Sequence, residues 1–189
     1  MKYLRLLLLL AISVLTSACA NVQMGKPSAS IDNIRLAKSS GIGPVAVGTF
    51  VPAQGKEEML EQPLSLRASR LSAPGGSFAG YLKETLEAEL AGASLLDSNA
   101  PIKLEGVLTD RQVNASMGQG SALLSARFIA KRNDKQVYDR ELSVNSAWDS
   151  PFVGAVAIPA AINEFTLLYR KLVGRLLSDP EFVSAVKAR

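Results

Sequence analysis

Three runs of alternating apolar and polar residues constrain the fold of this chain more than any other feature. They cover residues 102–109, 121–131 and 136–148, and even-numbered residues of the middle run are apolar from 122 to 130. Such alternation is typical of a β-strand with one buried face and one solvated face. Asn133 and Asp134 suit a tight hairpin turn between the second and third runs. The sequence therefore predicts a three-stranded antiparallel meander.

Two long helices and one short helix are expected around this meander. Ser77 is a suitable N-cap for a helix that ends at Gly92, and Pro159 suits the first turn of a second long helix. Asp179 followed by Pro180 suits the start of a short terminal helix. Apolar residues recur at helical spacing at Phe78, Tyr81, Leu82, Leu86 and Leu90, and again at Ile162, Phe165, Leu168, Tyr169, Leu172 and Leu176.

The complete order of predicted elements is β-β-α-β-β-β-α-α. Two strands, at residues 45–51 and 64–71, precede the first helix, and the charged segment 52–63 between them is expected to be a solvated loop. Each amphipathic helix needs an apolar surface, and a half-polar antiparallel sheet offers one on a single face. We therefore expect an α+β fold, a two-layer sandwich of a mainly antiparallel sheet with both long helices packed on one face.

The N-terminus has the pattern of a secretory signal peptide. Lys2 and Arg5 form a positive start, residues 6–15 are almost entirely apolar, and small residues up to Ala18 precede the only cysteine, Cys19. The apolar core is too short for a transmembrane helix, which needs about 20 apolar residues. We therefore expect cleavage between Ala18 and Cys19.

Residues 15–19, Leu-Thr-Ser-Ala-Cys, resemble the lipobox of bacterial lipoproteins, although Thr16 stands where the lipobox usually has leucine. The resemblance implies a diacylglycerol on the Cys19 thiol and an acyl chain on its new amino group. Such anchoring is strong, because each buried CH₂ contributes roughly 0.8 kcal/mol. Ala20 stands where aspartate usually retains lipoproteins in the inner membrane, so the resemblance implies the periplasmic face of the outer membrane. The alternative is ordinary secretion with a free Cys19 thiol.

After loss of the signal peptide, residues 1–18, the chain is expected to have a tether and one domain. Residues 19–43 are rich in glycine, proline and serine, which predicts a lipidated N-terminus and a flexible tether with an r.m.s. span of about 25–30 Å. Residues 44–189 are expected to form a single periplasmic α+β domain. The alternative is a shorter tether that contains a strand at Ile31, Ile34 and Leu36.

The residue types that are missing limit the chemistry. The chain has no histidine and only one cysteine. This excludes histidine-based metal sites, Ser-His-Asp and Cys-His catalysis, intrachain disulfides and thiolate metal clusters. We therefore expect no catalytic residue, no metal and no cofactor apart from the lipid on Cys19. Without residues 1–18, 19 Lys and Arg face 17 Asp and Glu, and this net charge of +2 makes nucleic acid a poor partner.

One stretch is a candidate contact surface. Residues 151–162 contain no charge, and Trp148 ends the last strand of the meander just before them. Trp148, Phe152 and Val153 are therefore candidates for an exposed apolar surface that docks a protein partner or a lipid tail. The alternative for Trp148 is ordinary packing at the edge of the sheet.

From residue 44 to residue 189 the layout resembles the YajG-like bacterial lipoproteins. The resemblance rests on the lipobox, the meander, the helix pattern Phe78-x-x-Tyr81-Leu82-x-x-x-Leu86-x-x-x-Leu90 and the helix end Ser178-Asp179-x-x-Phe182. The architecture is also similar to the LptE-type lipopolysaccharide-assembly subunit and to the auxiliary lipoproteins of ABC-type lipid transporters. The YajG-like group implies no established activity, and Cys19 is the one functional residue that the resemblance transfers.

Three functions remain open. We expect a non-enzymatic outer-membrane lipoprotein, a binding or accessory subunit in cell-envelope assembly or transport with an envelope protein as partner. The alternative is an autonomous lipid- or glycan-binding lipoprotein, which a deep apolar pocket between helices and sheet would favour. A histidine-free peptidoglycan hydrolase comes third, and carboxylates that converge in a cleft would be its sign.

Overall fold

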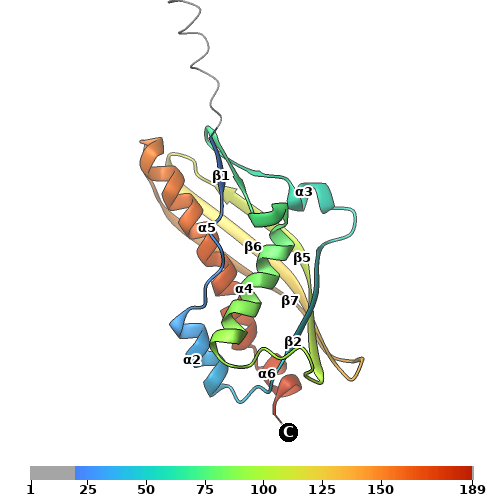
Figure 1. Cartoon of the computed structure of the whole chain (residues 1–189). Helices are drawn as coiled ribbons and strands as arrows, with labels where there is room; N and C mark the ends of the chain where they lie inside the picture. Colours follow the sequence, from blue (N-terminus) through green and yellow to red (C-terminus); the bar gives the residue numbers. More distant parts are fainter. Residues whose placement is uncertain (1–19, 189) are drawn as a thin grey trace, which may run out of the picture.

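The computed structural model describes residues 20–188, which form a sheet layer and a helix layer (Figure 1). The main sheet has the strand order β2-β5-β6-β7. β5 (Ile102–Asn114), β6 (Gly118–Arg132) and β7 (Lys135–Ser150) form the predicted antiparallel meander, with the predicted hairpin turn between the last two. β2 (Ala46–Pro52) confirms the first predicted strand and lies parallel to β5 at one edge.

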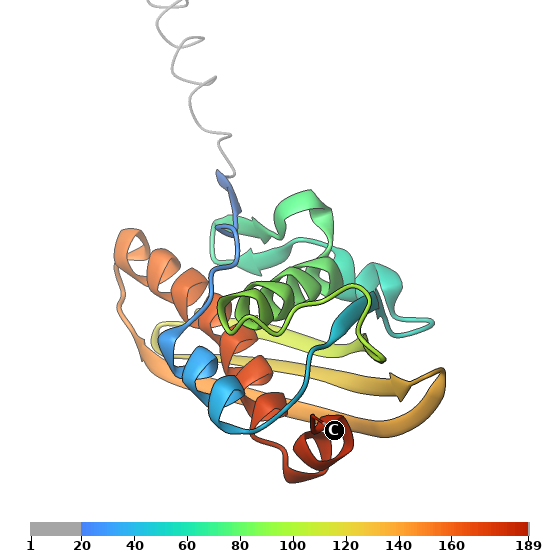
Figure 2. The ribbon, with the colours of Figure 1, turned by 60° about the horizontal axis from the view of Figure 1, so that its bottom comes forward.

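Two long helices pack on one face of this sheet, as expected (Figure 2). α4 (Phe78–Gly92) contacts β2 and β5, and α5 (Gly154–Leu177) contacts β6 and β7. The short α6 (Pro180–Val186) begins at its predicted cap, where Asp179 Oδ1 accepts hydrogen bonds from two backbone N–H groups. The buried aromatic rings that join the two long helices are Phe78, Tyr81, Phe165 and Tyr169. The fold is therefore an α+β two-layer sandwich.

Helix α5 begins earlier than predicted. It starts at Gly154, so Pro159 lies in its second turn and not in its first. A proline at this position lacks the N–H that would bond to the carbonyl of Ala155, but that carbonyl lies in an exposed turn at the end of the helix. The uncharged residues 154–158 are therefore helical, and they form one end of the molecule.

The segment between β2 and β3 is more structured than predicted. Residues 52–63 are not simply a solvated loop, because they contain helix α3 (Glu57–Glu61), whose Leu60 is fully buried. The last residue of α3, Glu61, reaches the start of α4. Its carboxylate accepts hydrogen bonds from Ser77 Oγ and from the backbone N–H groups of the first two residues of α4. Glu61 therefore caps a helix that does not contain it.

A second, smaller sheet has the order β1-β4-β3. The single strand predicted at residues 64–71 is wrong, because the chain turns back between β3 (Leu64–Leu66) and β4 (Ser69–Ser72). β1 (Ala20–Gln23) lies parallel to β4, and the 3₁₀ turn η2 (Pro74–Gly76) leads from β4 to α4.

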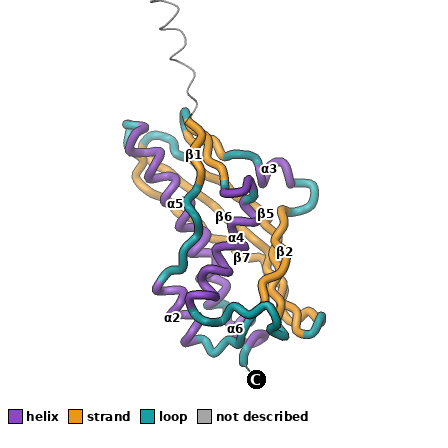
Figure 3. The backbone as a smooth tube through the Cα atoms, viewed as in Figure 1, coloured by secondary structure: helices purple, strands orange, loops and turns teal. Residues whose placement is uncertain are grey.

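Residues 20–43 are not a flexible tether (Figure 3). After β1 the chain passes over the long helices and forms α2 (Ile31–Ser39), a helix and not a strand. Glu89 of α4 is fully buried and accepts hydrogen bonds from Ser30 N at 2.8 Å and from Asn33 Nδ2 at 2.9 Å. A buried carboxylate requires such partners, so these bonds hold the segment against the domain. The folded part of the chain therefore includes this segment.

Glu61→Ala is expected to lower the free energy of unfolding by about 1–3 kcal/mol, because three donors lose a charged acceptor. Glu58→Ala is the matched control, since Glu58 lies exposed on the same helix, and it should change the free energy of unfolding by less than about 0.5 kcal/mol. Urea unfolding followed by circular dichroism measures both values. Equal losses in the two variants would contradict the capping role of Glu61.

Candidate functional site

Apolar side chains are exposed at the end of the molecule where the β5–β6 loop meets the start of α5. Phe152 is 80% exposed, Met117 is 63% exposed, and Val153 and Val156 are each 56% exposed. We call these four residues the apolar tip. Phe152 and Val153 thus have the exposure that the predicted contact surface requires, and the docking of a partner there stays a prediction.

The apolar tip borders an open hollow of about 600 Å³. Its lining comes from the β3–β4 hairpin, the β5–β6 loop, the segment between β7 and α5, and α5 itself. The lining residues are Arg67, Ala68, Ser116, Met117, Phe152, Gly154 and Ile158. The chain carries no charged residue from 150 to 163, so the first turns of α5 have no charge on their exposed side. A surface helix normally carries charged or polar residues on its outer face. The exposed surface of the tip is therefore more apolar than the outer face of an ordinary surface helix.

Trp148 lies near the apolar tip but packs against the core. Its ring covers Gly120 of the neighbouring strand, where a Cβ atom would come within 2.3 Å of the indole. The indole Nε1 is buried and finds no hydrogen-bond partner among residues 20–188. Of the three residues predicted for a contact surface, Trp148 therefore fits the alternative of packing at the sheet edge.

Arg67 holds the backbone beneath the apolar tip. Its Nε donates to Ala115 O at 2.7 Å, and its Nη1 donates to Phe152 O at 2.9 Å. Its Nη2 donates to Pro151 O at 2.7 Å and to Ser150 Oγ at 3.0 Å. Only a guanidinium offers a planar set of donors for such a group of acceptors. No local pattern in the sequence points to this role, because the partners lie 48 to 85 residues away along the chain.

The described chain begins at the same end of the molecule (Figure 1). Ala20 in β1 pairs with Ser69 in β4, two residues after Arg67. The predicted lipidation site, Cys19, and the predicted cleavage site between Ala18 and Cys19 lie outside the described residues. Cys19 directly precedes Ala20, and Cα atoms of consecutive residues are about 3.8 Å apart. A lipid on Cys19 would therefore be attached close to the apolar tip.

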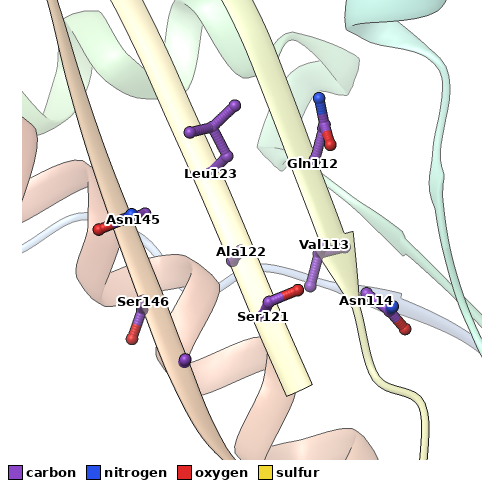
Figure 4. A pocket seen from close by; sticks show the side chains of 9 residues that line it. Gln112, Val113, Asn114, Ser121, Ala122, Leu123, Asn145 and Ser146 are labelled. Atoms are coloured by element: carbon purple, nitrogen blue, oxygen red, sulfur yellow. The ribbon is translucent and has the colours of Figure 1, made fainter. Parts of the chain in front are cut away.

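A second open hollow, of about 570 Å³, lies on the sheet face opposite the helices (Figure 4). Gln112, Leu123 and Asn145 form one row across β5, β6 and β7, and Asn114 and Ser121 lie beside them. These side chains are neutral amides, a hydroxyl and an aliphatic group. Such a lining suits hydrogen bonds to an uncharged polar ligand.

The buried ionisable groups of the domain serve the fold. Arg111 of β5 donates to three carbonyl groups at the end of α3 and lies 3.9 Å from the centre of the Phe78 ring. Burial lowers the pKa of Arg111, and burial raises the pKa of the neighbouring Tyr169. Within residues 20–188, no three Asp, Glu or Cys side chains come together as a metal site would require.

Comparison with known proteins shows a shared fold. No family model matches this chain, and no curated protein matches its sequence significantly. Protein XCC0632 from Xanthomonas campestris, assigned to family DUF330, has a TM-score of 0.55 at 10% identity, with 84% of this chain and 94% of that chain covered. At this identity the likeness shows the fold alone.

Two further solved structures are similar at lower TM-scores. The protein CT253 from Chlamydia trachomatis has a TM-score of 0.48 at 12% identity, with 76% of this chain and 99% of that chain covered. A minor lipoprotein from Acinetobacter baumannii has a TM-score of 0.42 at 9% identity, with 74% and 93% covered. The YajG-like resemblance stays a prediction. In the part of the chain that the structure describes, no helix has the length and apolar character needed to cross a membrane.

Arg67→Lys is expected to loosen the apolar tip, because an ammonium group cannot donate to four acceptors from one planar fork. We expect the free energy of unfolding to fall by about 1–3 kcal/mol. Amide hydrogen exchange, measured by mass spectrometry, should rise at residues 115–118 and 151–154. Arg70→Lys, at an exposed position of the same hairpin, is the matched control and should change neither quantity. Unchanged exchange in Arg67→Lys would mean that other contacts hold the tip.

Proposed function

We propose that this chain is a non-enzymatic lipoprotein of the bacterial envelope, anchored through Cys19 and acting as a binding or accessory subunit in envelope assembly or transport. One observation carries the proposal. Ala20, the residue that follows the lipobox cysteine, already belongs to a sheet, where it pairs with Ser69 beside the apolar tip. The attachment point and the exposed apolar surface therefore share one end of the molecule. The lipid on Cys19 is the only non-protein group that this function requires.

The proposed location is the periplasmic face of the outer membrane. Ala20 supports it, because lipoproteins retained in the inner membrane usually carry aspartate at this position. The proposed partners are the membrane itself and one envelope protein. The net charge of +2, from 19 Lys and Arg against 17 Asp and Glu in the chain from Cys19 onward, argues against nucleic acid as a partner.

Autonomous glycan binding is the second candidate, and the neutral polar hollow on the outer sheet face favours it. A lipid-binding module is less well supported, because buried side chains such as Phe128 and Phe165 fill the space between sheet and helices. A histidine-free hydrolase ranks third. Glu61, at the end of α3, and Glu89, within α4, both accept hydrogen bonds from backbone N–H groups and so serve the fold.

Acylation of Cys19 is the first expectation. In a Gram-negative host that expresses the full chain, the mature protein should incorporate labelled palmitate and sediment with the outer membrane. Mass spectrometry should find its N-terminal peptide at Cys19 with the added diacylglycerol and acyl groups. Cys19→Ala should lose the label and the membrane fraction, whereas Thr16→Leu, which brings the sequence closer to the usual lipobox, should keep both. A mature protein with an unmodified Cys19 thiol would overturn the proposed anchor.

An accessory subunit should have a partner at fixed stoichiometry. In-cell crosslinking of the lipidated protein, followed by purification and mass spectrometry, should recover one envelope protein in a constant ratio. Cys19→Ala should weaken the crosslink, because the unanchored protein is displaced from its partner. Co-purified glycan without a protein partner would favour the second candidate. Recovery of neither would contradict the accessory role.

A further inference from the structure

We propose that the apolar tip, formed by Met117, Phe152, Val153 and Val156, inserts into the interface of the membrane that holds the Cys19 lipid. The proposal rests on the proposed function, because it takes Cys19 as the attachment point. It assigns this surface to lipid and leaves the other faces of the domain for a protein partner.

Two contacts place the tip at the attachment point. Ala20 pairs with Ser69 at the start of β4. Two residues earlier in the same hairpin, Arg67 donates to Phe152 O at 2.9 Å. Because Ala20 directly follows Cys19 and is fixed in a sheet, no free backbone separates the anchor from the domain. A membrane that holds acyl chains on Cys19 therefore lies against this end of the molecule.

The chemistry of the tip suits a lipid interface. Residues 150–163 carry no charge, and the charged residues that flank them are Asp149 in β7 and Glu164, well inside α5. The first turn of α5 contains no acidic residue, so the positive end of its dipole would face phosphate head groups without a competing carboxylate in that turn. Interfacial helices bury their apolar side chains about 5–10 Å into the boundary between head groups and acyl chains.

The size of the tip favours lipid over a protein partner. Four side chains with these exposures present on the order of 400 Å² of apolar surface. Stable protein interfaces bury about 800 Å² on each partner. A membrane contact needs less area from the tip, because the acyl chains on Cys19 supply most of the attachment.

Two contacts with the membrane give the domain one orientation. The turn between β6 and β7 lies at the opposite end of the molecule from the start of β1 (Figure 1). Val137, which follows this turn in β7, is 36% exposed and should stay in water. It therefore provides a control position for a test at Phe152.

Fluorescence quenching tests this orientation. The chain that begins at Cys19 is coupled through that thiol to a maleimide phospholipid in vesicles of phosphatidylethanolamine and phosphatidylglycerol, with or without brominated acyl chains. Trp148, the only tryptophan, is replaced in Trp148→Phe, and either Phe152→Trp or Val137→Trp is added. Brominated lipid should lower the fluorescence at position 152 at least about twofold and should leave the fluorescence at position 137 nearly unchanged. Equally weak quenching at both positions would overturn the proposal.

The natural sequence provides a second measurement, should Trp148→Phe fail to fold. Coupling to vesicles should slow amide hydrogen exchange at residues 116–118 and 152–156, relative to the same chain blocked at Cys19 with N-ethylmaleimide in solution. Exchange at residues 133–137 should not change. Unchanged exchange at the tip would overturn the proposal. So would a solution dimer that Phe152→Asp abolishes, because the tip would then belong to a second copy of the chain.

The chemical coupling separates this proposal from the proposed function. The maleimide lipid supplies the anchor whether or not cells acylate Cys19. Acylation in cells with no quenching at position 152 would overturn the tip contact alone. Quenching without acylation in cells would overturn the lipoprotein assignment, and the tip would remain a membrane-binding surface.

Discussion

The guanidinium of Arg67 joins the three segments that meet at the end of the molecule where the apolar tip lies. It lies in the turn between β3 and β4, and its donors reach the β5–β6 loop through Ala115 O and the segment just before α5 through Phe152 O. Backbone carbonyl groups at such a junction need donors, and no regular strand or helix supplies them there. β1 pairs with β4, the second strand of the hairpin that contains Arg67, so the described chain begins beside this junction. Arg67 therefore holds the apolar tip next to the hairpin on which the proposed anchor depends.

The elements that could be predicted from the sequence are those whose signal is local. The meander and α4 repeat their apolar residues with a period of two or of 3.6 over eight residues or more, and both are present. The small sheet consists of strands of three or four residues, which are too short to display a period. Residues 20–43 have the composition of a linker, yet Glu89 binds Ser30 and Asn33 from 56 or more positions away. The composition of a segment indicates how flexible the segment would be in isolation. It does not reveal which residues elsewhere in the chain the segment will contact.

The residues of the candidate site also fall into two groups, those that a local sequence signal predicts and those whose position depends on distant residues. A missing charge is visible in a sequence, so Phe152 and Val153 could be proposed as an exposed surface, and they are exposed. The cysteine of a lipobox is equally visible, although Cys19 lies outside the described residues. The position of Trp148 depends on Gly120 in the neighbouring strand, and that of Met117 depends on how the β5–β6 loop meets α5. Arg67 looked like any polar residue of a strand, because three of its four acceptors are backbone carbonyl groups, which every residue type has.

The parallel pairing of β1 with β4 also has a mechanical consequence. A force applied at Ala20 along β1 acts across all the hydrogen bonds of the ladder from Ala20–Ser69 to Gln23–Ser72 at once, in shear. The same bonds would open one after another if the strand were peeled from its end. The bond from Met24 N to Ser72 O and the bond from Tyr81 Oη to Gly25 O come next along the chain and add further resistance. A pull on a membrane anchor would therefore be transmitted directly to the domain, as through a rigid coupling.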